Sequence, residues 1–435
     1  MQKNTSRKIA YFAIFASLIG ANVFAIDLGF FQLSLFRMTI IAVVFLFLLS
    51  LGTKTQYLGI SGKFANRFSV GFMIFWALYA VLSFFWVQDY NAWIKAVYFL
   101  ILNVICIIFF MNTFDRSAQI LTGLRVFAFM AILHNLIGWY EILARQYFFL
   151  DANLISLYRY LRYPVSIFGN TNDFATFMLI SVFILFACMQ NTKKKYMQYV
   201  YGATIVSSIV LLFMASSRAN ILGLLVALVV FVWLNLYNKK TQIFVFAMLL
   251  PLFFLIILKP DIFKNAFLMI LDGFYFDTSS ASDSINIRLN LLRNGVVFLI
   301  NTYGAGTGAG NVEFWMANAS VYGTSGIVNM HNWWMEILTG YGIIVFVLYI
   351  TFYALLTRNS YMKYKNALTK TDKTISLCFL CSLIGYIIGG MSSSSNLSSE
   401  WLWVFWSIVI TYQGLELTLP QKQIKDDKND RRVIG

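Results

Sequence analysis

The chain has 435 residues, of which 60% are hydrophobic and 12% are charged, and its mean hydropathy is positive, at +0.72. A soluble fold of this length could not bury so much apolar surface, so the composition excludes a soluble protein and indicates one embedded in a membrane. The formal net charge of +15 would suit a nucleic-acid-binding protein. The basic residues, however, stand in the polar breaks between apolar runs, which argues against that class.

Apolar runs long enough to cross a bilayer, about 20 residues for a core about 30 Å thick, repeat along the chain. They predict an all-α polytopic fold with about twelve spans. The spans cover residues 9–26, 33–51, 69–87, 93–111, 120–143, 174–190, 198–215, 219–237, 242–258, 333–357, 374–391 and 401–418. The first run has the layout of a signal peptide, but no small-residue cleavage site stands near Asp27, so we expect an uncleaved helix.

Most of the 33 Lys and Arg fall in alternate connections between these spans. The connections are the N-terminus with Lys3, Arg7 and Lys8, then residues 52–68, 112–119 with Arg125, 191–197, 238–241 and 358–373, and the tail. Because Lys and Arg accumulate on the cytoplasmic side, both termini are predicted to be cytoplasmic and the other connections to face outside. We expect one transmembrane domain, residues 1–420, and a charged, disordered cytoplasmic tail, residues 421–435.

Two of the outer connections are long, residues 145–173 and residues 259–331, and the second lies between the ninth and tenth spans. Within it, apolar residues recur at helical spacing, at Ile285, Leu289, Leu292 and Val296. Asp283 stands before them and is suited to cap a helix. The large loop is therefore predicted to contain short amphipathic helices near the membrane surface, with Arg288 and Arg293 on other faces.

A glycine-rich run follows, with glycine at positions 304, 306, 308 and 310. Such a run forms a nucleotide-binding turn only between a strand and a helix of a βαβ unit. Here it follows a predicted helix in an exported loop. We therefore expect a packed turn, or a backbone wall against a bulky ligand, rather than a dinucleotide site.

Arginine is in excess on the outer side, where the charge bias disfavours it. The residues are Arg145, Arg159, Arg162, Arg218, Arg288 and Arg293. A single arginine at the end of a span, such as Arg218 in Ser216-Ser217-Arg218, can simply extend its charge into the interface. Several together favour a bound anion, because the planar guanidinium group makes two-point contacts with phosphate oxygens.

The chain has two histidines. His331 precedes the tenth span, where it has either a structural hydrogen-bonding role or a role in proton transfer. His134 lies in the middle of the fifth span and is predicted to be a packing histidine with satisfied hydrogen bonds. The four cysteines also lie in spans and are predicted to be buried thiols. No cluster has metal-ligand spacing, so we expect neither a metal nor a cofactor.

Several of these motifs occur in one order along the chain. They are Gly169 to Ala175, Ser216-Ser217-Arg218, Arg288, Gly304 to Asn311, His331-Asn332, Glu336, Gly340 and Gly342. In this order and topology they resemble the core of the O-antigen ligase and Wzy-type polymerase superfamily. The resemblance places the family core at residues 165–345.

Members of this superfamily transfer a glycan from undecaprenyl diphosphate to an acceptor hydroxyl at the outer face of the bacterial cytoplasmic membrane, with inversion and without a metal. By resemblance, Arg218 and Arg288 would hold the diphosphate and His331 would orient or deprotonate the acceptor hydroxyl. We also predict a set of substrate-binding residues, Arg159, Arg162, Asn172, Arg293 and Asn332. The implied partners are the lipid-linked donor, the glycan acceptor, membrane lipid, a chain-length regulator and a flippase, and no nucleic acid.

The motifs leave the acceptor open. A polymerase adds the glycan to another lipid-linked repeat unit and so builds O-antigen, capsule or exopolysaccharide, whereas a ligase adds it to lipid A core, and relatives use protein or wall polymer. We favour a polymerase because no extra exported domain for a protein acceptor is visible. A lipid-linked oligosaccharide flippase or transporter is the further alternative, but such proteins usually show internal repeats, and none is evident here.

Overall fold

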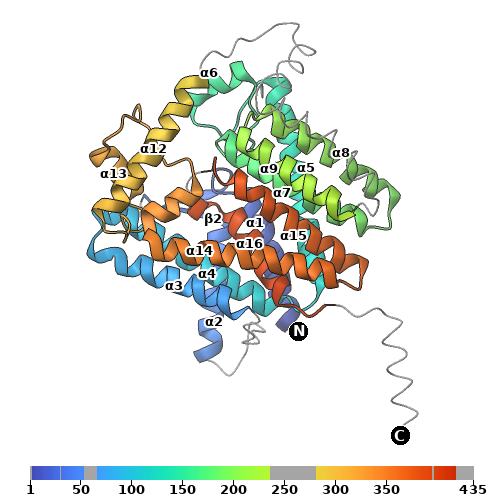
Figure 1. Ribbon diagram of the computed structural model, residues 1–435. Coiled ribbons are helices and arrows are strands. Elements are labelled where there is room, and N and C mark those ends of the chain that lie inside the picture. Colours follow the sequence, from blue (N-terminus) through green and yellow to red (C-terminus); the bar gives the residue numbers. More distant parts are fainter. Residues whose placement is uncertain (1, 30, 53–65, 236–280, 394–395, 418–435) are drawn as a thin grey trace, which may run out of the picture.

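The computed structural model describes residues 2–29, 31–52, 66–235, 281–393 and 396–417. In these segments nearly every element is a helix, and the predicted all-α class is confirmed. The exception is a short antiparallel hairpin of β1 (Ala25–Asp27) and β2 (Gln32–Ser34). Long helices pack along one another in a single bundle, with α12 and α13 at its left edge in Figure 1.

The long helices of the bundle are α1 (Gln2–Ile19), α2 (Leu35–Gly52), α3 (Arg67–Leu82), α4 (Tyr90–Thr113), α5 (Ser117–Ala144), α7 (Thr171–Gln190), α8 (Lys195–Met214), α9 (Arg218–Asn235), α14 (Trp333–Asn366), α15 (Lys370–Gly389) and α16 (Glu400–Gly414). The connections between them carry α6 (Ala152–Leu161), α12 (Ala281–Asn301), α13 (Val312–Ala319) and the 3-10 turns η1 (Ser83–Phe85) and η2 (Asn396–Ser398).

Eight helices in the described part of the chain are long and apolar enough to cross a membrane, which identifies a multi-pass membrane protein. They are α3 with η1, α4, α5, α7, α8, α9, α14 and α15. Helices α2 and α16 correspond to two further predicted spans. The first predicted span, residues 9–26, is wrong at its C-terminal end, because α1 stops at Ile19 before the left-handed Gly20 and residues 25–27 form β1. The ninth, residues 242–258, lies outside the described residues, so the count of twelve and the orientation stay predictions.

Hydrogen bonds join the predicted outer connections to one another at one end of the bundle. The backbone N–H of Asp89 donates to the Asn311 side chain (2.7 Å), and the backbone N–H of Trp333 donates to the Gly390 carbonyl (2.9 Å). These contacts place the start of α4, the glycine-rich run, the start of α14 and the loop after α15 at the same end. Residues far apart in sequence thus meet there.

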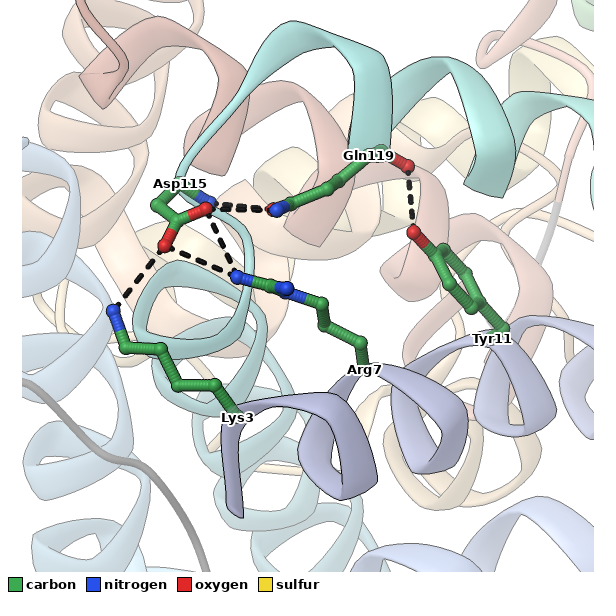
Figure 2. A network of polar contacts seen from close by, with 5 residues as sticks. All are labelled: Lys3, Arg7, Tyr11, Asp115 and Gln119. Carbon is green, nitrogen blue, oxygen red and sulfur yellow. Dashed lines mark hydrogen bonds and ion pairs between the residues drawn. The ribbon is translucent and has the colours of Figure 1, made fainter. Parts of the chain in front are cut away.

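Two of the predicted cytoplasmic segments, the start of α1 and the connection between α4 and α5, are joined by ion pairs. Asp115, between α4 and α5, pairs with Lys3 at 3.2 Å and with Arg7 at 3.3 Å, and Figure 2 shows how both reach it from α1. Burial alone would raise the pKa of Asp115, but hydrogen bonds from Gln119 and Lys3 and the charge of Arg7 lower it below its ordinary value. The cluster fixes the start of α1 against the start of α5.

Close packing of α9 against α15 positions one side of the site. A Cβ atom on Gly223 would come within 2.4 Å of the Gly385 carbonyl oxygen, so the two backbones touch. Small residues at such crossings let membrane helices approach closely. This contact fixes the course of α9, whose first residue is Arg218.

The buried polar residues of the core agree with the sequence analysis. His134 is buried, with Nδ1 3.0 Å from the Ser166 hydroxyl and Nε2 2.9 Å from the Leu18 carbonyl oxygen. Its predicted role as a satisfied packing histidine is confirmed. All four cysteines are free and buried, as predicted.

Candidate active site

The Ser216-Ser217-Arg218 motif is a tight turn that starts α9. Ser216 has a left-handed φ of 54°. The buried Ser217 hydroxyl donates to the Asn172 side-chain oxygen at 2.8 Å. The buried Asn220 amide donates to Ser217 at 2.9 Å and to Ser392 at 3.1 Å. The backbone of the motif is therefore fixed by α7 and by the loop after α15, while the Arg218 side chain is exposed.

Arg288 lies on α12, the helix predicted in the large outer loop. The described part of the helix already includes residue 281, so Asp283 lies within the helix and does not precede it as the expected cap. One face of α12 is buried, through Leu291, Asn294 and Phe298. The apolar residues Leu289 and Val296 stay exposed on another face, as suits a helix beside a membrane surface.

The glycine-rich run, residues 304–310, connects α12 to α13 and packs against α14. Its four glycines all have φ between 72° and 92°. The N–H of Gly308 donates to the Gly340 carbonyl (2.9 Å), and the N–H of Ile343 donates to the Gly304 carbonyl (2.9 Å). A Cβ atom on Gly306 would lie 2.5 Å from the Gly342 nitrogen. The predicted packed turn is confirmed, and it holds α12 against the break in α14 at Gly342.

His331 stands directly before α14 in a left-handed conformation, with φ of 47°. Its backbone N–H donates to the Asn329 side-chain oxygen at 3.0 Å, and the Asn329 amide donates to Glu313 of α13 at 2.9 Å. Non-glycine residues held in this region of φ concentrate at functional sites. The imidazole is half-buried and has no hydrogen-bond partner within the described segments.

Arg288 lies within electrostatic reach of Arg218 and of His331. The Arg288 side chain still reaches solvent, but partial desolvation lowers its pKa, and the charge of Arg218 lowers it further. Desolvation also lowers the pKa of His331, and the charge of Arg288 adds to that effect. A histidine whose pKa lies below its ordinary value of about 6.5 is mostly neutral at neutral pH.

The two arginines carry charge, and the described part of the chain supplies no counter-ion for it. Among the residues that the structure describes, neither Arg218 nor Arg288 forms an ion pair with a carboxylate. Two neighbouring positive charges favour an anion between them, and guanidinium groups bind phosphate oxygens in two-point contacts. The arrangement can therefore hold an anion beside a neutral base.

Arg159 and Arg162 lie on α6 and at its end, in the other long outer connection. Arg159 on α6 donates to the Arg145 carbonyl at 3.1 Å, and Arg162 is the buried, left-handed residue that ends α6. The pKa of Tyr147 is raised, first by burial and then by the charges of Glu141 and Tyr158, and the charges of Arg159 and Arg162 oppose this only in part. No direct contact joins them to Arg288 in the described segments, so their substrate role stays a prediction.

The other three predicted binding residues have structural contacts. Arg293 donates to Asn290 at 3.3 Å and lies over the Tyr322 ring at 5.7 Å, so it lies against residues 320–322. Asn332 caps α14 by accepting from the N–H groups of Trp334 and Met335. Asn172 holds the Ser217 turn. Asn172 thus lies beside the turn that carries Arg218, and Asn332 follows His331 at the start of α14.

The match to a known protein family covers these motifs. Residues 203–350 match the family described as O-antigen ligase, and this stretch contains Arg218, Arg288, the glycine-rich run and His331. The predicted resemblance to the O-antigen ligase and Wzy-type polymerase superfamily is confirmed. The chain is therefore similar to membrane enzymes that assemble polysaccharides.

One curated relative extends this similarity over nearly the whole chain. The chain is 26% identical over 405 residues to the teichuronic acid biosynthesis protein TuaE of Bacillus subtilis (strain 168). The match covers 92% of this chain and 83% of that protein. It supports a role in polysaccharide assembly for the full set of helices, beyond the region that the family model matches.

Proposed function

We propose that this protein is a membrane glycosyltransferase that polymerises undecaprenyl-diphosphate-linked oligosaccharide repeat units into a surface polysaccharide. The reaction is a metal-independent inverting transfer at the outer face of the bacterial cytoplasmic membrane. The observation that carries the proposal is the pair of neighbouring arginines, Arg218 and Arg288, which form no ion pair with a carboxylate among the described residues. His331, whose pKa is lowered, lies beside Arg288. The similarity to the O-antigen ligase family supports it.

In the proposed reaction the acceptor hydroxyl attacks the anomeric carbon of the donor sugar. The bond from that carbon to the diphosphate oxygen breaks, and a bond to the acceptor oxygen forms on the opposite face, which inverts the configuration. Negative charge grows on the departing diphosphate, where Arg218 and Arg288 stabilise it. His331 takes the proton of the acceptor hydroxyl, and its lowered pKa leaves the ring free to do so at neutral pH.

A ligase is the second candidate, because the matching family is described as O-antigen ligase. The same three residues would serve it, since donor and chemistry are shared. The two functions differ in the acceptor, which is a second lipid-linked repeat unit for a polymerase and lipid A core or another molecule for a ligase.

The test supplies the purified protein, in proteoliposomes, with lipid-linked repeat units as the sole substrate. A polymerase produces a ladder of longer lipid-linked chains and releases undecaprenyl diphosphate in step with each bond formed. His331→Ala should lower the rate by about 10²–10⁴-fold, whereas Asp115→Asn, far from the site, should keep it. Product only after lipid A core is added would favour the ligase, and no transfer to either acceptor would contradict both.

A further inference from the structure

A second site lies at the same end of the bundle, on elements outside the arginine cluster. An open cavity of about 700 Å³ is lined by the end of α1, the β1–β2 hairpin, α4 and the starts of α7 and α16. We name it the hairpin cavity. Its charged lining residues are Asp27, Arg37, Lys95, Asp173 and Glu400. Its volume falls in the range of small-molecule sites, roughly 300–1,000 Å³.

Glu400 presents a hydrogen-bond acceptor that the protein leaves unused. Its side chain is only 7% exposed, and one oxygen is 2.7 Å from Nε of Arg37 and accepts from the Ser34 hydroxyl at 2.5 Å. The other oxygen, Oε2, is buried and has no hydrogen-bond partner among the residues described. Leaving a buried carboxylate oxygen unsatisfied is unfavourable. A ligand hydroxyl in the cavity would satisfy it.

The remaining walls suit a sugar. Asp27 accepts from the Gly29 N–H at 2.8 Å, and Asp173 accepts from the Asn170 amide at 2.6 Å, so each carboxylate is held in place at the cavity. The half-buried rings of Phe31 and Phe168 also line it. Fixed acceptors for hydroxyl groups, next to aromatic faces for the apolar side of a ring, are complementary to a carbohydrate.

The charge of the cavity separates it from the diphosphate site. Its lining carries three carboxylates and two cations, and one of the cations, Arg37, is already paired with Glu400. A diphosphate would be repelled here, whereas Arg218 and Arg288 would attract it. A hydroxyl-rich group without phosphate fits the hairpin cavity better.

A smaller cavity, of about 200 Å³, lies between the hairpin cavity and residues next to His331, although His331 itself does not line it. Asn329, Met330 and Trp333, which flank His331, line it together with Glu336. It shares Lys95, Phe99 and Ser398 with the hairpin cavity. The two spaces therefore adjoin along α4, and a ligand in the first can extend toward His331.

We propose that the hairpin cavity binds sugar residues of the acceptor glycan, with Glu400 and Asp27 accepting hydrogen bonds from its hydroxyl groups. The chain then passes through the smaller cavity, which brings the reacting hydroxyl to His331. That the bound sugar is the acceptor of the reaction rests on the proposed function. The binding of a hydroxyl-rich oligosaccharide rests on the cavity itself.

The test uses an oligosaccharide released from the lipid-linked repeat unit of the same cells, which lacks diphosphate and can therefore act only as an acceptor. Its affinity is measured by titration of the purified full chain in lipid nanodiscs. Glu400→Gln should weaken binding at least about tenfold, because a hydrogen bond to a charged group is lost. Asp27→Asn, at an exposed position, should weaken it about threefold or more, and Asp115→Asn should not.

Removal of one partner of the buried Arg37–Glu400 pair can destabilise the fold. Asp27→Asn leaves this pair intact and therefore tests oligosaccharide binding independently. No binding by the wild-type protein at millimolar oligosaccharide, or equal binding by the wild type and Asp27→Asn, would overturn the proposal. Steady-state kinetics distinguish whether the bound sugar belongs to the acceptor or to the donor. Both variants should raise KM for the free oligosaccharide acceptor, and a rise in KM for the lipid-linked donor alone would assign the cavity to the donor and overturn the proposal.

The two proposals fail in different ways. Oligosaccharide binding that depends on Glu400 and Asp27, in a protein that makes no glycosidic bond, would leave the carbohydrate site in place and remove the transferase function. Polymer synthesis that is unchanged in both variants would keep the transferase and remove the hairpin cavity from it.

Discussion

His331 combines two properties that a base for a hydroxyl group needs. It is half-buried at the start of α14, held by a backbone hydrogen bond to Asn329, and its pKa is lowered by desolvation and by the charge of Arg288. A histidine with a lowered pKa is unprotonated at neutral pH and can accept a proton. Its neighbour Arg288 therefore affects the base as well as the proposed diphosphate.

The acid side of the pH profile tests this link. Activity that requires neutral His331 is lost as pH falls through its pKa, which lies below the ordinary value of about 6.5. Arg288→Gln removes a positive charge that favours the neutral ring, so the pKa of His331 should rise. The acidic midpoint of the residual activity should then move to higher pH, as measured from rates between pH 4 and 8.

Arg293→Gln serves as the matched change, because Arg293 lies on the same helix but against Tyr322. Its acidic midpoint should stay at the wild-type value. An unchanged midpoint in Arg288→Gln would show that the two residues are not coupled and would contradict the account of His331 as the base.

At the residue scale the sequence could predict those groups that carry a local motif. Arg218, Arg288 and His331 stand in short recognisable stretches, and the structure brings them together. The hairpin cavity could not be predicted, since Ser34 and Glu400 meet across 366 positions of the chain. The structural roles of Arg293 and Asn332 also depend on contacts, with Tyr322 and with the first turn of α14, that spacing alone did not assign.

The glycine-rich run is the element that sets the position of α12. Gly306 has a φ of 84°, and a Cβ atom there would meet the backbone at Gly342 and Gly340 within 2.8 Å. Gly306→Ala should therefore destabilise the protein by about 1–3 kcal/mol and displace Arg288, with loss of most transfer activity. The measurements are the thermal unfolding midpoint in detergent and the rate of polymer formation.

Gly323 provides the control for this change, because a Cβ atom there has nothing within 4 Å and the residue is exposed. Gly323→Ala should alter stability by no more than about 0.5 kcal/mol. Wild-type stability and activity in Gly306→Ala would show that the close packing of the run does not position the site.

At the element scale, the apolar runs predicted the long helices well, because a helix that crosses a membrane needs about 20 consecutive apolar residues. The helical spacing of apolar residues also predicted α12, but it did not predict which face of the helix packs against the protein. Leu289 and Val296 are exposed, whereas Asn294 is fully buried. The Asn294 side chain accepts from the N–H groups of Val321 and Tyr322, a loop contact that periodicity does not encode. Burial on α12 thus follows hydrogen bonding as well as hydropathy.

At the scale of the whole molecule, the proposed functional end is distinct from the charged cluster around Asp115. Arg218, Arg288 and His331, the hairpin cavity and the smaller cavity beside His331 belong to connections that the charge bias places outside. A lipid-linked donor anchored in the bilayer would then reach the arginines, while its glycan and the acceptor occupy the water-exposed end. In the proposed reaction the diphosphate and the acceptor sugars thus occupy two sites, and the reacting groups meet at His331.

The central claim is that Arg218 and Arg288 hold the diphosphate. The most direct measurement is the affinity of undecaprenyl diphosphate, without a glycan, for the purified protein in nanodiscs. Arg288→Gln should weaken binding about tenfold or more, through the loss of charge-assisted contacts, whereas Arg293→Gln should change it at most about twofold. Equal affinity of the wild type and Arg288→Gln, or an equal loss in both variants, would contradict the claim.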